Sequence, residues 1–234
     1  MESRDRSPLD NPVWHALTGP LRGFAVSGMP EGVMRMDPEV GIFWALERFD
    51  AASWERLADA VGVGGFCGLV HGEIGTLPEG WTAHHRGGLV QMVAGEVGDP
   101  GRSDFEVLGP GDFADMLELA TSTRSSPFLP RTGELGGYLG WRDEGRLLAM
   151  AGRRFRVPGF AEVSAVSTHP DARRRGFATA LTLTLVQRIR ERGEEAFLHV
   201  EASNESAWRL YRALGFVERR RLEVAWLEWS GRDA

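Results

Sequence analysis

Three arginines, a glycine and a small residue stand together where a predicted strand gives way to a predicted helix. The stretch RRRGFA, residues 173–178, follows EVSAVSTHPDA and precedes an apolar helical pattern. The first N–H groups of a helix lack acceptors and carry partial positive charge, so a phosphate satisfies both. Gly176 would let the backbone approach the ligand, Ala178 would leave room beside it, and the arginine side chains would add contacts at the rim.

The loop departs from two familiar phosphate-binding motifs. The Gly-Lys-Ser/Thr of a Walker loop is absent, and no Gly-x-Gly-x-x-Gly joins this strand to its helix. The 27 basic residues are all arginine, so the choice of arginine carries little information in this chain. From the loop alone, an anion site and a solvated basic turn that caps the helix both remain open.

A second group of residues follows in HVEASNESAWRLYRALGF. Asn204 and Tyr211 are seven positions apart and therefore point along nearly the same side of a helix. The two stretches together resemble signatures of the GNAT superfamily of N-acetyltransferases, Gln/Arg-x-x-Gly-x-Gly/Ala and Asn-x-x-Ala/Ser-x-x-x-Tyr-x-x-x-Gly-Phe. The second signature is matched by Asn204, Ala207, Tyr211, Gly215 and Phe216. The resemblance covers roughly residues 104–234 and is greatest to bacterial members.

The resemblance implies an acyl-CoA cosubstrate, usually acetyl-CoA, and no metal. It places the pyrophosphate on the backbone amides of residues 174–179 and the pantetheine arm between two strands that splay apart before the loop. A backbone N–H near Val166 would polarise the thioester carbonyl. The cofactor-binding residues that it implies are Val166, Ser167, Thr168, Arg173, Arg174, Arg175, Gly176, Phe177, Ala178, Thr179, Asn204 and Ala207.

The resemblance also implies catalytic roles. Tyr211 occupies the position of the general acid that assists the departing thiolate, although a core aromatic on an amphipathic helix would look the same. Glu162 is the leading candidate for the base that takes the proton of the amine, with His199 and His169 as alternatives. Strict alternation would put Glu162 on one face with Val166 and Thr168. A Glu162 that faces solvent would instead be an ordinary charged strand residue, and Asn204 is equally a helix N-cap.

The implied function is that of an enzyme, an acyl-CoA-dependent N-acyltransferase. It would transfer acetyl to a primary amine of a small molecule, amino acid or peptide by direct attack in a ternary complex. Residues 121–140 are expected to select the acceptor, with Arg124 or Arg131 pairing with a substrate carboxylate. The alternative is a GNAT-fold binding module that senses acyl-CoA or a metabolite without turnover.

The elements that must position these residues follow one another from residue 104 onwards. The patterns predict a strand, a helix, several strands, the helix after the arginine loop, a strand, the helix that begins near Asn204, and a final strand or hairpin. The predicted fold is α/β or α+β, with a mixed, mostly antiparallel sheet flanked by helices.

The first hundred residues carry no such signature. Strands are predicted over residues 41–49, 64–72 and 89–97, with a helix over 50–61 that is capped by Asp50. The Gly, Pro, Asp and Ser of EVGDPGRSD indicate a boundary near residues 98–104. We therefore predict an N-terminal α/β domain over residues 1–100, interpreted as a degenerate GNAT-like half, and an acetyltransferase domain over 104–234.

Composition narrows the class of protein. The 234 residues carry a formal charge of −6, with 42% hydrophobic and 26% charged residues. This is typical of a globular chain and argues against nucleic-acid binding through the arginines. His71, His84 and His85 lack the spacing of zinc ligands, and the single Cys67 excludes an internal disulfide. We expect a cytoplasmic monomer or homodimer with no membrane partner.

Overall fold

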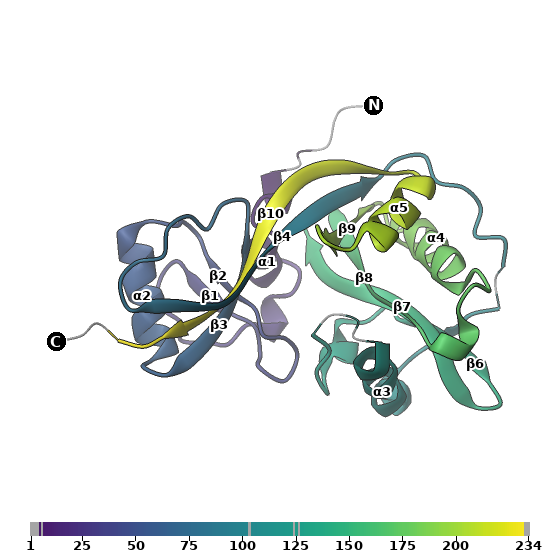
Figure 1. Ribbon diagram of the computed structural model, residues 1–234, viewed down its shortest axis with the longest axis horizontal. Coiled ribbons are helices and arrows are strands. Elements are labelled where there is room, and N and C mark those ends of the chain that lie inside the picture. The colour runs from purple at the N-terminus through teal and green to yellow at the C-terminus, as the bar shows by residue number, and fades with distance from the viewer. Residues whose placement is uncertain (1–4, 6, 103, 124, 126, 232–234) are drawn as a thin grey trace.

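The computed structural model describes residues 5, 7–102, 104–123, 125 and 127–231, and these contain one large sheet (Figure 1). Within them, eight strands run in the order β3-β10-β4-β9-β8-β7-β6-β5. Every neighbouring pair is antiparallel except β8 and β9. The strands of the sheet are β3 (Gly65–His71), β4 (Trp81–Ala94), β5 (Glu106–Val107), β6 (Leu139–Asp143), β7 (Arg146–Val157), β8 (Phe160–Thr168), β9 (Glu195–Glu201) and β10 (Phe216–Trp229). The predicted mixed, mostly antiparallel sheet is confirmed.

Helices cover both faces of the sheet (Figure 1). Successive residues of β7 show the two layers, because Ala149 and Ala151 belong to the core beneath α4, whereas Met150 belongs to the core beneath α3. The first helix, α1, packs on the same side as α3, and α2 lies over β3 and a separate two-stranded ribbon. The helices are α1 (Pro12–Leu17), α2 (Ala51–Val61), α3 (Phe113–Thr123), α4 (Phe177–Arg190) and α5 (Glu205–Ala213), and the ribbon consists of β1 (Val33–Arg35) and β2 (Trp44–Leu46).

The N-terminal part of the chain contributes a central strand to this sheet. Strand β4 precedes residues 98–104, yet it lies between β9 and β10, with Val93 opposite both Phe197 and Val217. Figure 1 shows β4 and β10 as two long strands that run from the α2 end of the molecule to the α5 end. One sheet therefore contains strands from both sides of the predicted boundary.

Several local predictions agree with the structure. Asp50 caps α2 by accepting a hydrogen bond from the backbone N–H of Ser53 at 2.8 Å. The arginine loop passes into α4, which buries Leu181, Leu185 and the rest of one apolar face. Strand β4 is longer than the predicted strand over 89–97, because its exposed first half pairs with β10 although it lacks apolar alternation. Tertiary pairing there overrides the local pattern.

The predicted alternation along β8 is wrong beyond Ser164. Ala165 has a positive φ of 52°, and the register with β7 shifts between the pairs Gly152–Ser164 and Met150–Ser167. Such an irregularity is a β-bulge, which adds a residue to one strand and re-aims the side chains after it. Consequently Val166 packs beside Val163 against the α4 core, whereas Ala165 belongs to the α3 core. Glu162 and Val166 do not share a face.

Candidate acyl-CoA site

The loop before α4 presents a row of backbone donors. Gly176 caps the helix in the left-handed region with φ 79°, and Arg174 has φ 61°. Among the described residues, none accepts a hydrogen bond from the N–H groups of residues 174–179. A cavity of about 230 Å³ lies in front of this loop, lined from Thr168 to Thr179. Unpaired N–H groups at a helix start, facing open space, are suited to bind a phosphate.

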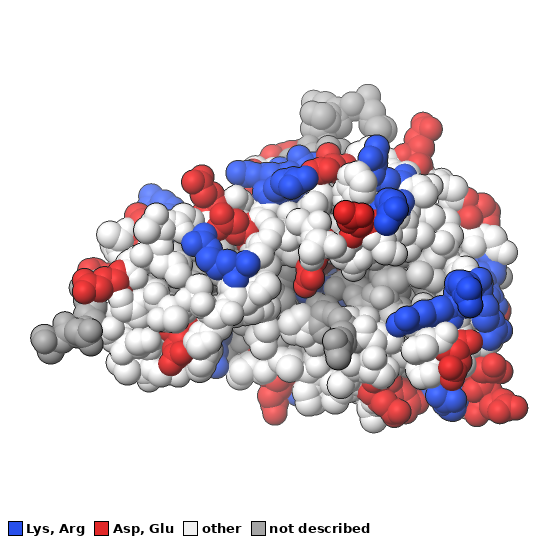
Figure 2. Space-filling view, in the orientation of Figure 1, with Lys and Arg blue, Asp and Glu red and all other residues white. Residues whose placement is uncertain are grey.

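The arginine side chains of the loop point in different directions. Arg173 lines the cavity and donates from Nε to the Thr168 carbonyl at 3.4 Å. Arg175 instead lies over the Trp141 ring, 4.6 Å from its centre, in a cation–π contact. Figure 2 shows basic side chains gathered where β6 and the start of α4 lie in Figure 1. The backbone, rather than a clamp of three guanidinium groups, thus offers the most regular set of anion donors.

A cleft opens between β8 and β9 next to this loop. The two parallel strands pair only from Phe160 to Glu162 and from Glu195 to Phe197, and beyond these residues they separate. The resulting cleft has a volume of about 690 Å³ and includes Val166 and Thr168 in its lining; the hollow in the middle of the face in Figure 2 matches its place. The buried hydroxyl of Thr168 has no hydrogen-bond partner among the described residues.

Helix α5 forms another wall of the cleft. Asn204 caps α5 by accepting from the Ala207 N–H at 3.1 Å, so the predicted N-cap is confirmed, and both residues line the cleft. Tyr211 lies two turns later and also lines it, with its ring edge-on to Phe216. Burial raises the pKa of Tyr211 to about 12, so its hydroxyl stays protonated at neutral pH. It is a hydrogen-bond donor to whatever group lies beside it.

Glu162 is 1% exposed and lies at the centre of a buried polar network. Arg154 donates to both of its carboxylate oxygens, at 2.7 and 3.0 Å, and His199 Nδ1 lies 2.8 Å from Oε1. Burial by itself raises the pKa of Glu162, but the charge of Arg154 and the bonds from both partners outweigh it and lower the pKa to about 2. Arg154 and His199 line the cleft, and Glu162 lies behind them.

Gln91 orients the His199 ring from the other side. Arg219 donates to Gln91 Oε1 at 2.8 Å, which fixes the orientation of this fully buried amide. Gln91 Nε2 therefore donates to the Leu9 carbonyl at 2.8 Å and to His199 Nε2 at 3.0 Å. An acceptor at Nε2 means that the proton of the neutral ring is on Nδ1, which donates it to Glu162.

Arg154 and Gln91 were not predicted from the sequence to be parts of the site. The one signal for Gln91 was an amide in the middle of the apolar run LVQMVA, where a polar side chain must find partners. Arg154 lies in the run RRFR, and every Lys or Arg position of this chain is arginine. Nothing in the sequence therefore distinguished Arg154 from the other arginines.

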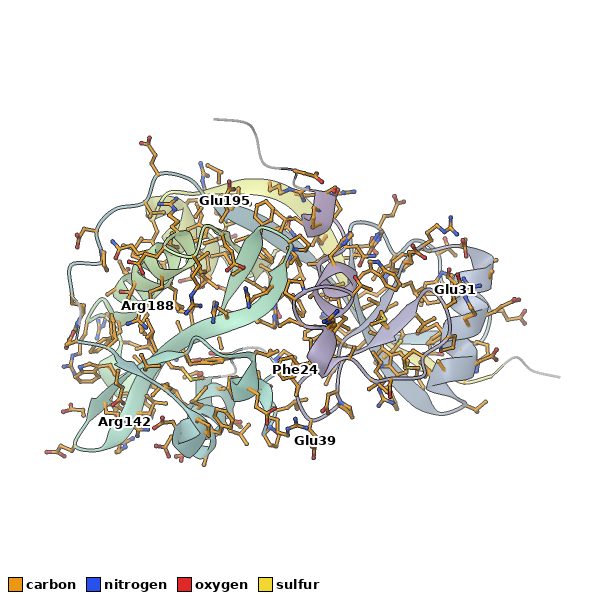
Figure 3. The ribbon with its side chains drawn as sticks, turned by 180° about the vertical axis from the view of Figure 1, so that it is seen from behind. Phe24, Glu31, Glu39, Arg142, Arg188 and Glu195 are labelled. Atoms are coloured by element: carbon orange, nitrogen blue, oxygen red, sulfur yellow. The ribbon has the colours of Figure 1, made fainter. Side chains whose placement is uncertain are left out.

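The segment over 121–140 reaches the cleft only in part. Thr123, Ser125 and Pro127 line it, whereas Arg131 pairs with Asp37, Glu39 and Glu134. Figure 3 shows Glu39 at the lower edge of the molecule. Arg124, the other arginine predicted to bind an acceptor carboxylate, lies outside the described residues.

The histidines considered above have other neighbours. His71 stacks on Phe49 at 4.2 Å, His84 lies 2.6 Å from Glu228, and His169 accepts from the Asp171 N–H within its own turn. No group of three or more His, Cys, Asp or Glu side chains that could hold a metal occurs in the part of the chain that the structure describes. Over the same part, the helices include none long and apolar enough to cross a bilayer.

The Glu162 network predicts a specific dependence of stability on pH. Because the pKa of Glu162 is lowered to about 2 in the folded protein, its contribution is fully present above its ordinary value near ~4.5. It is lost as the pH falls from there towards 2. The urea concentration at the midpoint of unfolding should be measured at pH 6, 4.5 and 3. It should decrease less with falling pH in Glu162→Gln than in the natural chain, because the variant lacks the carboxylate. Parallel curves for the two proteins would contradict the assigned pairing.

Three comparisons with known proteins agree with this geometry. The family described as FR47-like protein matches residues 138–227. The crystal structure of an acetyltransferase of the GNAT family from Novosphingobium aromaticivorans is 37% identical and superposes with a TM-score of 0.87, over 96% of this chain and 99% of that one. The arginine loop and the Asn204–Phe216 signature lie within these matched regions.

Mycothiol acetyltransferases are similar over shorter stretches. The protein from Thermomonospora curvata is 34% identical over 126 residues, and that from Rhodococcus jostii is 44% identical over 70 residues. The matches cover 51% and 30% of this chain but only 42% and 23% of those proteins, so the chain spans less than half the length of these relatives. The match along nearly the whole of the Novosphingobium aromaticivorans protein shows that the chain belongs to the GNAT family of acetyltransferases.

Proposed function

We propose that the protein is an acyl-CoA-dependent N-acyltransferase that transfers an acetyl group to a primary amine by direct attack in a ternary complex. The observation that carries the proposal is the row of N–H groups at residues 174–179, which have no acceptor among the described residues, next to a cleft opened by the separation of β8 and β9. These features fit the pyrophosphate and the extended pantetheine arm of CoA. Thr168 lines both cavities and so lies where the loop meets the cleft.

The contacts proposed for CoA come from the arginine loop, from the β8 edge and from α5. The amides of residues 174–179 bind the pyrophosphate, and the β8 edge from Val166 to Thr168 pairs with the arm. Asn204 and Ala207 border the arm from α5. When bound, acetyl-CoA supplies a thioester carbonyl; its carbon–sulfur bond breaks as the amine nitrogen forms the new amide bond, and the amine loses one proton.

Tyr211 is proposed to donate a hydrogen bond to the departing thiolate rather than to transfer its proton fully. With the pKa of Tyr211 raised to about 12 and that of a thiol near ~8.5, complete transfer would be uphill. A hydrogen bond from a partly buried phenol still stabilises negative charge on sulfur as it develops.

Glu162 is proposed to act through His199. A carboxylate with a pKa of about 2 is a weak base, but its bond to His199 Nδ1 holds the ring with Nε2 as the basic nitrogen. Nε2 accepts a hydrogen bond from Gln91, so uptake of a proton by His199 requires that bond to give way to a water or the amine. In this arrangement Glu162 is a positioning residue and His199 the candidate base.

Replacing Tyr211 with Phe tests the proposed role of the hydroxyl. We expect kcat to fall by about 100-fold, within the range for loss of a proton-donating group, because the ring and its packing on Phe216 remain. The Kd for CoA, measured by calorimetry on the same variant, should change less than about twofold. Unchanged kcat would remove Tyr211 from the mechanism.

A thiol-release assay separates the enzyme from the alternative, a GNAT-fold sensor of acyl-CoA. Acetyl-CoA is first titrated into the protein by calorimetry, and free CoA is then measured over a panel of primary amines. The proposal expects binding followed by release of CoA that depends on the amine. Binding with no release from any amine would favour the sensor, and no binding would contradict both.

A further inference from the structure

The end of the cleft away from the arginine loop has an apolar wall. Phe43, Val70 and Leu89 come from the N-terminal part of the chain, and Val224 and Trp226 come from β10. The wall is held in place by contacts within the protein. The centroids of the Phe43 and Trp226 rings lie 6.2 Å apart, and the backbone of Phe43 forms a β-bridge with Gly68 on β3. Preorganised apolar surface of this kind binds an apolar group without having to rearrange.

The Trp226 ring packs closely on the backbone of Gly68. A Cβ added at Gly68 would lie 1.9 Å from Cζ3 of the Trp226 ring, so the ring lies directly on the glycine backbone. Any larger residue at this position would displace the indole from its observed position. The position of the aromatic wall is therefore determined by the pairing of β3 with β10, where Gly68 is opposite Trp226.

One carboxylate of the cleft has no ion-pair partner among the residues that the structure describes. The described cleft residues with charged or titratable side chains, apart from Tyr211, are His85, Arg154, Arg173, His199 and Glu201. Arg154 and His199 both bond to Glu162, and Arg173 lies at the loop end of the cleft. Glu201 is exposed, and among the described residues the structure shows no ion pair to it. It ends β9 opposite Leu89, a member of the apolar wall.

We propose that the acceptor is a primary amine carried on an apolar, preferably aromatic, group. Its apolar group packs on Phe43 and Trp226, and its ammonium is attracted to Glu201 before it loses its proton. An amino acid with a free carboxylate is disfavoured, because it would meet Glu201 as a like charge and Arg154 as a guanidinium already paired with Glu162. This inference rests on the proposed function for the role of the amine, but its binding prediction does not require turnover.

Calorimetric titrations into the protein saturated with CoA test this acceptor class. Phenethylamine is expected to bind at least about tenfold more tightly than ethanolamine, because only the former buries a ring on the apolar wall. It is also expected to bind at least about tenfold more tightly than phenylalanine, which adds the disfavoured carboxylate. Equal affinities for the three ligands, or a preference for ethanolamine or phenylalanine, would overturn the proposal.

Two pairs of variants assign the effect to the named side chains. Trp226→Leu should reduce the preference for phenethylamine over ethanolamine several-fold, whereas Trp229→Leu, on the same strand but outside the cleft, should leave it unchanged. Glu201→Gln should weaken phenethylamine binding about fivefold, and Glu205→Gln, an equal charge change on α5, should not. If Trp226→Leu fails to fold, the proposal is still tested by the variants Glu201→Gln and Glu205→Gln and by the preference of the natural chain for phenethylamine.

The same samples distinguish this inference from the proposed function. A preference for phenethylamine without release of CoA from acetyl-CoA would support the binding class and contradict catalysis. Release of CoA that is fastest with ethanolamine or with phenylalanine would support catalysis and overturn the apolar acceptor. A protein that fails to bind CoA would contradict the proposed function before any amine is added.

Discussion

Gly176→Glu is expected to abolish CoA binding, with an affinity loss of at least about 100-fold. Gly176 is the N-cap of α4 with φ 79°, and a Cβ built there meets no atom within 4 Å. A glutamate side chain would thus enter the open space in front of the unpaired N–H groups, where its carboxylate could accept their hydrogen bonds itself. The glutamate would both occupy the proposed pyrophosphate site and repel the pyrophosphate by its negative charge.

Gly193→Glu is the matched control for this variant. Gly193 lies in the turn after α4, has φ 76°, and likewise has no atom within 4 Å of a built Cβ. Both substitutions force a left-handed conformation on a residue with a side chain, at a cost of roughly 1–2 kcal/mol, so they should lower Tm similarly. Calorimetry should show CoA binding lost only in Gly176→Glu. Equal Kd values for the two variants would place the pyrophosphate elsewhere.

Glu162→Ala is expected to destabilise the fold by about 3 kcal/mol, because the guanidinium of Arg154, only 14% exposed, loses the carboxylate that it contacts twice. His199 would also lose the acceptor for its Nδ1 proton. The free energy of unfolding, extrapolated from urea titrations at neutral pH, measures the effect.

Asp104→Ala provides the comparison at an exposed site. Asp104 also accepts two bonds from one arginine, Arg102, but its side chain is 53% exposed. Removing an exposed carboxylate of this kind should lower the free energy of unfolding far less than Glu162→Ala does, because solvent screens the pair. If Glu162→Ala cost no more than Asp104→Ala, the buried network would not be the structural element described above.

The parts of the site that depend on local backbone could be predicted from the sequence. The unpaired donors before α4 and the N-cap at Asn204 follow from glycine, asparagine and helix periodicity at fixed spacings. The order of the elements after residue 104 follows from the same patterns. The mixed sheet and its flanking helices were therefore predictable, as was membership of the GNAT family.

Features that arise from tertiary pairing could not be predicted in this way. Nothing local marks Ala165 as a bulge, since alanine rarely adopts a positive φ, and the bulge redirects the side chains after Ser164. The partners of Glu162 come from β7 and β9, which lie next to β8 only in the folded sheet. Phe43 and Trp226 are 183 positions apart in the chain, so their shared wall was likewise invisible in the sequence.

Transfer of the acetyl group itself is the most direct test of the central claim. The protein is incubated with acetyl-CoA labelled with carbon-13 in the acetyl group and with a primary amine, and the products are measured by mass spectrometry. The account predicts labelled N-acetyl amine and free CoA in equal amounts, both dependent on the amine and both lost in Gly176→Glu. Free CoA with unlabelled amine, or no amine-dependent product with any amine despite tight acetyl-CoA binding, would contradict it.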